Sequence, residues 1–419
     1  MLLLLSCLAA LGLPGARADF WDDFSNNLAT DLAPFVSLFG EQTTKQYLSE
    51  SITRLDYFIF AMAPIGILTA LVSAIRVCGS PSLRAFIGRA QEGEANAEAE
   101  LCSSTSRDVC ELYNNGGIAR VFGRPKILEV VHDPNVSDSE FDSPDGSAGI
   151  YTFREYMKTG NGQKEWSLRR GADVESPPEE YAPNLSHNVG IKRPDDWVFV
   201  VVALLGFVLQ GGVLVFAACV TYYLRWEKNG EQPPSYACPL VITGTLAMCA
   251  GVYLCAHLVG QSTEEHIFGE RKASAQQSSL FWIQPRQVLG DQTFDPFCRV
   301  DRGGGNSLRQ YTASWKKPNK SSELVVWLAV GISVAGFVLQ FVGLRGIHSA
   351  ISVAQLGAAL VMSVARSALR MQRLATKDND LSDCRDLVDR HELDWLALRI
   401  GEKAIEAALP PEPPRKCRG

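Results

Sequence analysis

The sequence predicts an α-helical multi-pass membrane protein with five transmembrane helices and a small α+β, β-rich module built from two of its loops. Three observations support this fold class. Apolar residues are clustered in blocks instead of being spread through the 419-residue chain. Five of these blocks reach spanning length without a single Asp, Glu, Lys or Arg. The two longest loops between them contain strand-like segments separated by turn residues.

The N-terminus resembles a secretory signal peptide. Residues 1–18, "MLLLLSCLAALGLPGARA", are an apolar run that ends in a small-x-small cleavage pattern. An uncleaved first membrane helix is the alternative, but the apolar run is shorter than the roughly 20 residues that a span needs. Residues 19–56 would then form an acidic, amphipathic outer segment, helical in its second half, along the membrane surface.

Five segments are predicted to cross the membrane. Soluble helices of this length nearly always carry a polar stripe, which these segments lack. At 1.5 Å per residue, about 19 residues approach the thickness of a hydrocarbon core. The predicted spans are residues 57–75, 197–224, 237–260, 324–344 and 347–365.

The distribution of basic residues predicts the orientation. The inner connections would be residues 76–196, 261–323 and the tail 366–419, and the outer ones residues 225–236 and the tight turn 345–346. Basic residues concentrate at the inner flanks: Arg76, Arg84, Lys192, Arg193, Lys316, Lys317, Arg366 and Arg370. The predicted outer side carries fewer: Lys45, Arg54, Arg225, Lys228 and Arg345. The positive-inside rule therefore predicts an outer N-terminus and a cytosolic C-terminus, in a secretory-pathway or plasma membrane.

Cysteines and glycosylation motifs bear on the same topology. Beyond the signal peptide, every cysteine outside the spans lies on the predicted cytosolic side, so we expect no disulfides. The sequons at Asn135, Asn184 and Asn319 also lie in cytosolic loops, where they would not be glycosylated. Glycosylation at any of them would invert the topology.

Both inner loops have the same mixed character. The first has an N-cap at Ser80, a short helical piece "SRDVCEL", and strand-like text in "GIARVF", "PKILEVV", "GIYTFREYM", "EWSLRR" and "NVGIKR". The second continues with "SSLFWIQPRQVLG" and "RQYTASW", and the tail has helical pieces around "HELDWLALRIG". Because the two loops face the same side, we expect them to fold into one module.

Three stretches resemble a family of uncharacterised multi-pass membrane proteins of filamentous fungi: "ELCSSTSRDVCELYNNGGIARVFGRPKILEVV", "LFWIQPRQVLGDQTFDPF" and "FVGLRGIHSAISVAQLGAALVMSVARSALRMQRL". The likeness covers nearly the whole chain after the signal peptide. Some members are annotated with ankyrin repeats, and this chain has no 33-residue ankyrin period. The resemblance implies a membrane fold and no particular activity.

The residues that chemistry would require are not grouped in the sequence. The six histidines are scattered and no Cys-x-x-Cys pair occurs, so we expect no metal, no cofactor and no catalytic site. A net charge of −6 argues against binding to nucleic acid. We expect the basic flanks to meet the anionic inner leaflet of the bilayer.

Two apolar 14-mers share seven identical positions, "WVFVVVALLGFVLQ" from Trp197 and "WLAVGISVAGFVLQ" from Trp327. Each opens a predicted helical hairpin, so the sequence predicts an internal repeat of two parallel hairpins. The tryptophans would anchor the interface. Gln210 and Gln340 would lie past mid-membrane and form a hydrogen bond to each other. Gln355, in the last span, would form a hydrogen bond to a closely packed neighbouring helix.

These features favour a membrane-anchored scaffold or sensor whose cytosolic module binds protein partners or a second copy of the chain. A transporter or channel built on repeated hairpins is the first alternative. A membrane enzyme with an unrecognised cytosolic site is the second.

Overall fold

The computed structural model divides the chain into two compact units, which we call the bundle and the module. The bundle comprises residues 1–103, 191–263 and 316–373, and the module comprises residues 104–190, 264–315 and 374–419. The residues that the structure describes are 40–51, 53–102, 104–106, 108–114, 117–136, 148–170, 194–228, 231–270, 278–301, 310–317, 323–372 and 388–408. The predicted signal peptide lies outside them.

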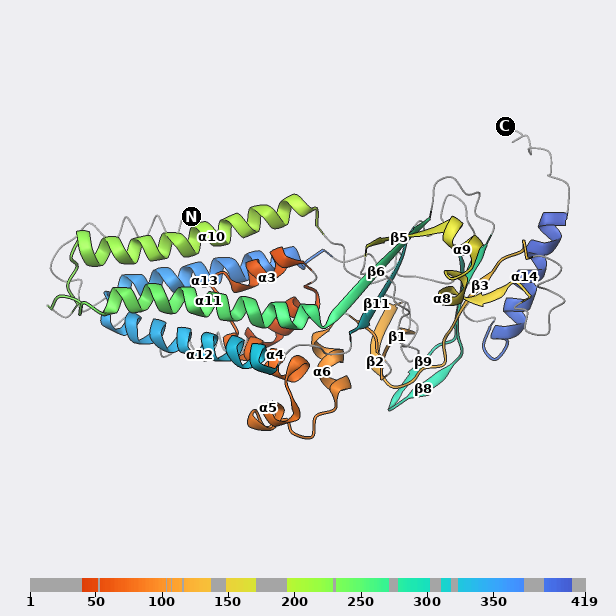
Figure 1. Ribbon diagram of the computed structural model, residues 1–419, viewed down its shortest axis with the longest axis horizontal. Helices are drawn as coiled ribbons and strands as arrows, with labels where there is room; N and C mark the ends of the chain where they lie inside the picture. Colours follow the sequence, from red (N-terminus) through yellow and green to blue (C-terminus); the bar gives the residue numbers. More distant parts are fainter. Residues whose placement is uncertain are drawn as a thin grey trace, which may run out of the picture. The chain divides into compact units, whose positions relative to one another are not determined.

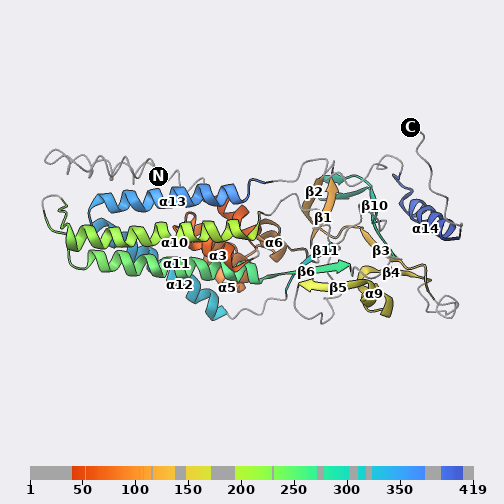
Figure 2. The same ribbon diagram turned by 90° about the horizontal axis from the view of Figure 1, so that it is seen from above.

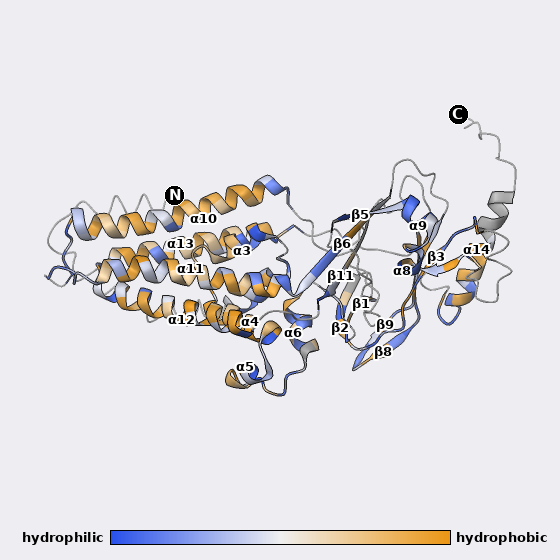
Figure 3. Ribbon diagram, viewed as in Figure 1, coloured by the Kyte–Doolittle hydropathy of each residue, from blue (hydrophilic) through white to orange (hydrophobic). Residues whose placement is uncertain are grey.

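Four long helices form the frame of the bundle. They are α10 (Asp196–Ala218, continued by the π-helical turn Cys219–Tyr223), α11 (Ala237–Gln261), α12 (Glu323–Gly346) and α13 (Ser349–Leu369). Each is long and apolar enough to cross a membrane, and hydrophobic residues dominate all four (Figure 3). They match four of the five predicted spans. α13 extends four residues past its predicted end and so includes Arg366.

The four helices pack as two antiparallel pairs, α11 with α12 and α10 with α13 (Figures 1 and 2). Glycine allows the first pair to approach closely, because a Cβ at Gly336 would collide with the backbone of Met248. The chain enters α10 and α12 and leaves α11 and α13 at one end of the bundle, which we call the connection end. The opposite turn end carries the short links that follow α10 and α12.

The predicted span 57–75 is not one continuous helix, and that prediction is wrong. The chain forms α3 (Arg54–Ala61), breaks at residues 62–66, and resumes as α4 (Ile67–Cys78). Pro64 lacks an N–H and disfavours helical geometry at the residue before it, and Ala63 has a φ of +47°. Gly66 follows in the left-handed region at +73°. The apolar composition of a span is present, but the backbone turns.

The two short helices form a hairpin that turns back inside the bundle, and for this reason we call it the re-entrant hairpin. α3 starts at the connection end, where the ring of Tyr57 lies 5.7 Å from that of His257 near the end of α11. The break reaches the interior of the bundle, where Met62 packs against Gly206 of α10. α4 then returns, and the Cys78 thiol donates to the carbonyl of Leu258, again near the end of α11.

The segment before α3 lies at the same end of the bundle. Residues 40–49 are helical, and Tyr47 and Leu48 are buried against the hairpin. Asp56, predicted to be outer, lies 2.9 Å from Arg370, predicted to be inner. The described part of residues 19–56 therefore lies at the same end of the bundle as the end of α13, because the hairpin does not cross the bundle.

In its described residues the module contains four small sheets. The largest is antiparallel with the order β10–β7–β3–β4: β3 is Leu128–His132, β4 Ile150–Thr152, β7 Ser279–Gln284 and β10 Phe297–Asp301. The second has the order β11–β6–β5: β5 is Trp166–Arg170, β6 Thr263–Glu270 and β11 Gln310–Lys316. Two hairpins complete it: β1 (Val109–Asn114) with β2 (Gly117–Phe122), and β8 (Gln287–Leu289) with β9 (Gln292–Phe294). Since β3 and β7 come from different loops, the two loops do fold together, as the sequence predicts.

Two local predictions in the first loop are wrong. The last four residues of the piece "SRDVCEL" belong to strand β1, because the chain after them turns back and pairs with them as β2. The text "GIYTFREYM" is a strand only through Thr152, whose side chain forms a capping box with Glu155 and starts the short helix α8 (Phe153–Tyr156). The predicted strand "NVGIKR" lies outside the described residues.

Shorter helices and the tail complete the two units. Helix α5 (Pro81–Phe86) has the predicted N-cap at Ser80, and α6 (Glu94–Leu101) follows it in the bundle. α9 (Gly160–Glu165) precedes β5 in the module. The tail forms α14 (Glu392–Ala408), which packs on β7 through Trp395, 6.2 Å from Phe281 between ring centroids.

Candidate functional site

A buried arginine caps the broken helix. Arg366, on the last turns of α13, is only 7% exposed. Its guanidinium donates from Nη1 to the Phe60 carbonyl (3.1 Å) and from Nη2 to the Ala63 carbonyl (2.9 Å), while Nε donates to Met362 on its own helix (3.1 Å). Carbonyls at the end of a helix have no partner within that helix. Arg366 therefore satisfies the polar backbone that the break in the hairpin exposes inside the bundle.

A second arginine, one turn further along α13, fixes the start of the hairpin. Arg370 donates from Nη2 to the Asp56 carboxylate at 2.9 Å, and its Nε lies 3.5 Å from Glu50. Its guanidinium also lies over the Tyr47 ring, 4.7 Å from the centroid, in a cation–π contact. The two arginines thus join the end of α13 to both the break and the first residues of the hairpin.

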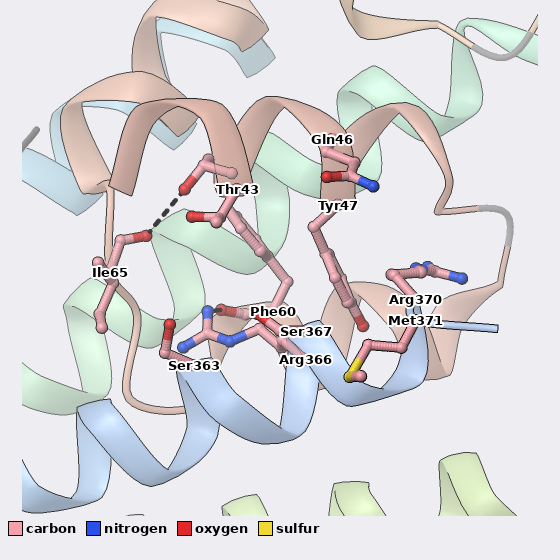
Figure 4. A pocket seen from close by; sticks show the side chains of 11 residues that line it. Thr43, Gln46, Tyr47, Phe60, Ile65, Ser363, Arg366, Ser367, Arg370 and Met371 are labelled. Atoms are coloured by element: carbon pink, nitrogen blue, oxygen red, sulfur yellow. Dashed lines mark hydrogen bonds between the residues drawn. The ribbon is translucent and has the colours of Figure 1, made fainter. Parts of the chain in front are cut away.

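A cavity of about 230 Å³ lies between these elements (Figure 4). It is bounded by helix 40–49, by the hairpin and by the last turns of α13. Its polar lining consists mainly of hydroxyl and guanidinium groups. Aromatic and aliphatic side chains form the apolar part of the lining. The lining residues are Thr43, Thr44, Gln46, Tyr47, Phe60, Ile65, Ser363, Arg366, Ser367, Arg370 and Met371. This donor-rich cavity is the candidate site.

The glutamines singled out by the sequence are paired, but not with each other. Gln210 and Gln355 exchange hydrogen bonds of 3.0 and 3.3 Å between α10 and α13. Gln340 donates to the Thr245 hydroxyl at 2.8 Å, between α12 and α11. The expected Gln210–Gln340 bond is wrong because α10 and α12 each pack against the second helix of the other hairpin.

The predicted interface tryptophans both lie in the first turns of their helices at the connection end. Trp197 is 65% exposed on α10. Trp327 on α12 is also exposed, and its ring lies 6.4 Å from that of Phe86 on α5. Exposed aromatic rings at this depth are typical of the boundary between hydrocarbon and water.

Several of the basic flanks are structural instead of lipid-facing. Arg76 is buried and forms ion pairs with Glu92 and Glu100, and Lys316 pairs with Glu98 at 2.6 Å. The Arg84 side chain donates to the Gly79 carbonyl. Lys192 and Arg193 lie outside the described residues.

The module holds polar groups that sequence reasoning did not select. The side chain of Gln284 accepts from the Tyr113 amide and donates to the carbonyls of Tyr113 and Asp295, so it joins β1 to β7. Glu165 accepts hydrogen bonds from Tyr156 and Ser278, both at 2.7 Å. These bonds satisfy buried groups within the module core.

One buried carboxyl in the module titrates unusually. Glu111 on β1 faces inward, and burial raises its pKa to about 7, opposed by the positive charge of Arg120 directly across the hairpin. Burial likewise raises the pKa of the Cys298 thiol to about 12, which makes it unreactive. Within the part of the chain that the structure describes, no His, Cys, Asp or Glu residues are grouped to hold a metal ion.

Sequence reasoning classified Arg366 and Arg370 only as basic flanks. Their four-residue spacing at the end of a span was a usable signal, because it places both on one face of a helix. Their partners could not be read from the sequence, since the carbonyls of Phe60 and Ala63 become available only when the helix breaks.

Comparison of the chain with protein-family models, curated proteins and solved structures finds no match. The resemblance to fungal membrane proteins therefore stays a prediction. The function is inferred from the structure itself.

Proposed function

We propose that this protein is a membrane-anchored scaffold or sensor that presents the module to protein partners. One observation carries the proposal: the described parts of three sections of chain that the spans separate, within residues 104–190, 264–315 and 374–419, belong to one compact unit with its own core. Building a domain from the connections of a bundle ties it to the membrane at several points. Such anchoring suits a protein whose working surface lies outside the bilayer.

We further propose that the connection end faces the cytosol, in the secretory pathway or the plasma membrane. The placement of Lys45 and Arg54 at the connection end strengthens the charge asymmetry, because among the described residues the turn end keeps only Arg225, Lys228 and Arg345. The signal peptide and the position of the N-terminus remain predictions.

The outer face of α14 is the proposed contact surface for partners. Leu393 and Leu398 are 65% and 69% exposed there, while Trp395 and Leu396 pack inward on the sheet. Exposed leucines on a docked helix are typical of a surface that a partner or a second copy covers.

Proximity labelling in the native host, with the labelling enzyme fused to the tail, tests the scaffold proposal. The full chain should give a reproducible set of neighbours, and L393D/L398D should lose part of that set. The matched control is V288D, which places the same charge on an exposed apolar site of the β8–β9 hairpin. A neighbour set that is identical for all three proteins would contradict the proposal.

Transport is a second candidate, and the re-entrant hairpin favours it. Irregular backbone at membrane depth occurs where protein buries it or where it lines a cavity, and discontinuous helices form the binding sites of many carriers. Flux through liposomes that contain the purified protein, compared with Q210L/Q340L, tests this candidate. No flux above that of empty liposomes would exclude it for the solutes assayed.

We also propose that the two hairpins, α10–α11 and α12–α13, are an internal repeat. In each, the glutamine that closes the repeated 14-mer bonds to the second helix of the other hairpin, at Gln355 and Thr245. A two-fold relation between parallel hairpins would exchange these two contacts. The matching choice of partner by the two glutamines supports the proposal beyond the likeness of the two apolar segments.

A further inference from the structure

The cavity beside Arg366 holds hydrogen-bond donors that the bundle leaves unused. A guanidinium has five N–H groups. Three of those on Arg366, one on each nitrogen, donate to the carbonyls of Met362, Phe60 and Ala63. One hydrogen on each terminal nitrogen remains, in a residue that lines the cavity. The N–H groups of a guanidinium bind the oxygens of oxyanions through charge-assisted hydrogen bonds.

No carboxylate among the described residues forms an ion pair with Arg366. Among the described residues, both carboxylates near the cavity, Asp56 and Glu50, pair with Arg370 instead. Arg366 itself forms bonds only to neutral carbonyls. A buried charge without a counter-ion is costly, so an anion that entered the cavity would be stabilised.

Serine hydroxyls extend this donor set along α13. Ser363 and Ser367 line the cavity at helical spacing with Arg366 and Arg370, and all four share one face of the helix (Figure 4). Neither serine hydroxyl forms a hydrogen bond to another described residue. Gln46 lines the cavity from helix 40–49 on the opposite wall.

The size and the position of the cavity define what it can hold. At about 230 Å³ it is smaller than the roughly 300–1,000 Å³ of sites for drug-sized ligands, so it suits one small group. It lies where α13 ends, and Met371 at its rim is 75% exposed. This is the depth at which a span meets the head groups.

From these observations we propose that the cavity binds a phosphate group through Arg366, Ser363 and Ser367. The phosphate belongs either to the head group of an anionic phospholipid or to a water-soluble phosphate. The site lies entirely within the bundle and does not depend on the module or on the scaffold function.

Native mass spectrometry of the full-length protein in a neutral detergent tests the proposal. The probes are phosphatidylglycerol and phosphatidylcholine with identical acyl chains, each with and without inorganic phosphate. The variants are S363A/S367A, which removes two lining hydroxyls, and S367A alone. The control S352A removes a hydroxyl from the same helix outside the cavity. Unfolding temperatures establish that each variant is folded.

We expect wild type and S352A to bind one phosphatidylglycerol in preference to phosphatidylcholine, or one inorganic phosphate. The variant S363A/S367A should bind the same probe at least about fivefold more weakly, because two hydrogen bonds to a charged group are lost. Selective retention of phosphatidylglycerol that inorganic phosphate does not displace identifies the lipid as the source. Displacement by inorganic phosphate, with the same dependence on the serines, identifies a soluble phosphate.

If the double variant is unstable, S367A carries the test, with a smaller loss in the same direction. The proposal is overturned if folded variants bind both probes as wild type does, or if wild type binds phosphatidylglycerol no better than phosphatidylcholine and does not bind inorganic phosphate.

Discussion

At the scale of single residues, one arginine replaces the hydrogen bonds that a continuous helix would have made. Arg366 donates to Phe60 and Ala63 at the point where α3 ends inside the bundle. A buried carbonyl without a donor is costly, because it has lost the hydrogen bond that water gives it in the unfolded chain. The hairpin and this arginine therefore depend on each other.

Substitution R366M should destabilise the bundle by about 2–4 kcal/mol, because it leaves two carbonyls of the hairpin without donors. The measurement is the free energy of unfolding of the full chain in mixed detergent. The control R54Q removes an exposed arginine and should change stability by less than about 0.5 kcal/mol. Equal effects of the two substitutions would show that Arg366 is not the cap described above.

Glu111 should make the stability of the module depend on pH. Its pKa is raised from 4.5 to about 7 in the folded chain. Below the unfolded value the carboxyl is neutral in both states and costs nothing. As the pH rises from the unfolded value through the folded one, the unfolded state loses its proton first, and the module loses about 3 kcal/mol of stability.

The variant E111Q should abolish this decline, because glutamine does not titrate. Pulse proteolysis of the module within the full chain, between about pH 4 and 8, measures the stability. The exposed carboxyl of Asp291 supplies the control, and D291N should keep the wild-type decline. A decline that persists in E111Q would mean that another group titrates.

At the scale of elements, glutamine pairs hold the helices in register. Gln210→Leu leaves the amide of Gln355 without its partner and should cost about 1 kcal/mol, whereas Q210L/Q355L should cost less than the sum of the two single substitutions. A double-mutant cycle on bundle stability measures the coupling. Strict additivity would contradict a direct bond between the two side chains.

The sequence predicted some elements well, for identifiable reasons. Four spans follow from uninterrupted apolar composition, and β2 and β7 follow from β-branched and aromatic residues between turns. The hairpin was missed because composition counts apolar residues and not backbone direction. The signal was present in "MAPIG", where a proline and a glycine stand two residues apart in the middle of the apolar run.

The candidate site could be predicted only in part. Arg366 and Arg370 are visible as basic residues at the end of a span, and their common helical face follows from their spacing. The opposite wall of the cavity comes from residues 43–65, more than 290 positions away in the chain. Their position depends on the hairpin turning back, which the composition of the span did not indicate.

At the scale of the whole molecule, the hairpin changes the topology. The topology that we propose, four crossings and one re-entrant hairpin, would place residue 54, residue 78 and the end of α13 on one side of the membrane. Five crossings would place residue 54 opposite the other two. The short outer links would then be confined to the turn end. This claim concerns sidedness and can be tested without any assumption about activity.

The most direct measurement is labelling of single cysteines with a membrane-impermeant thiol reagent in sealed vesicles, in a background with the native cysteines replaced. The reporters L55C, A85C and S235C lie on exposed positions before the hairpin, after it and at the turn end. The re-entrant topology predicts that L55C and A85C react from the same side and S235C from the other. Labelling of L55C from the side of S235C would show that the segment crosses the membrane and would contradict the account.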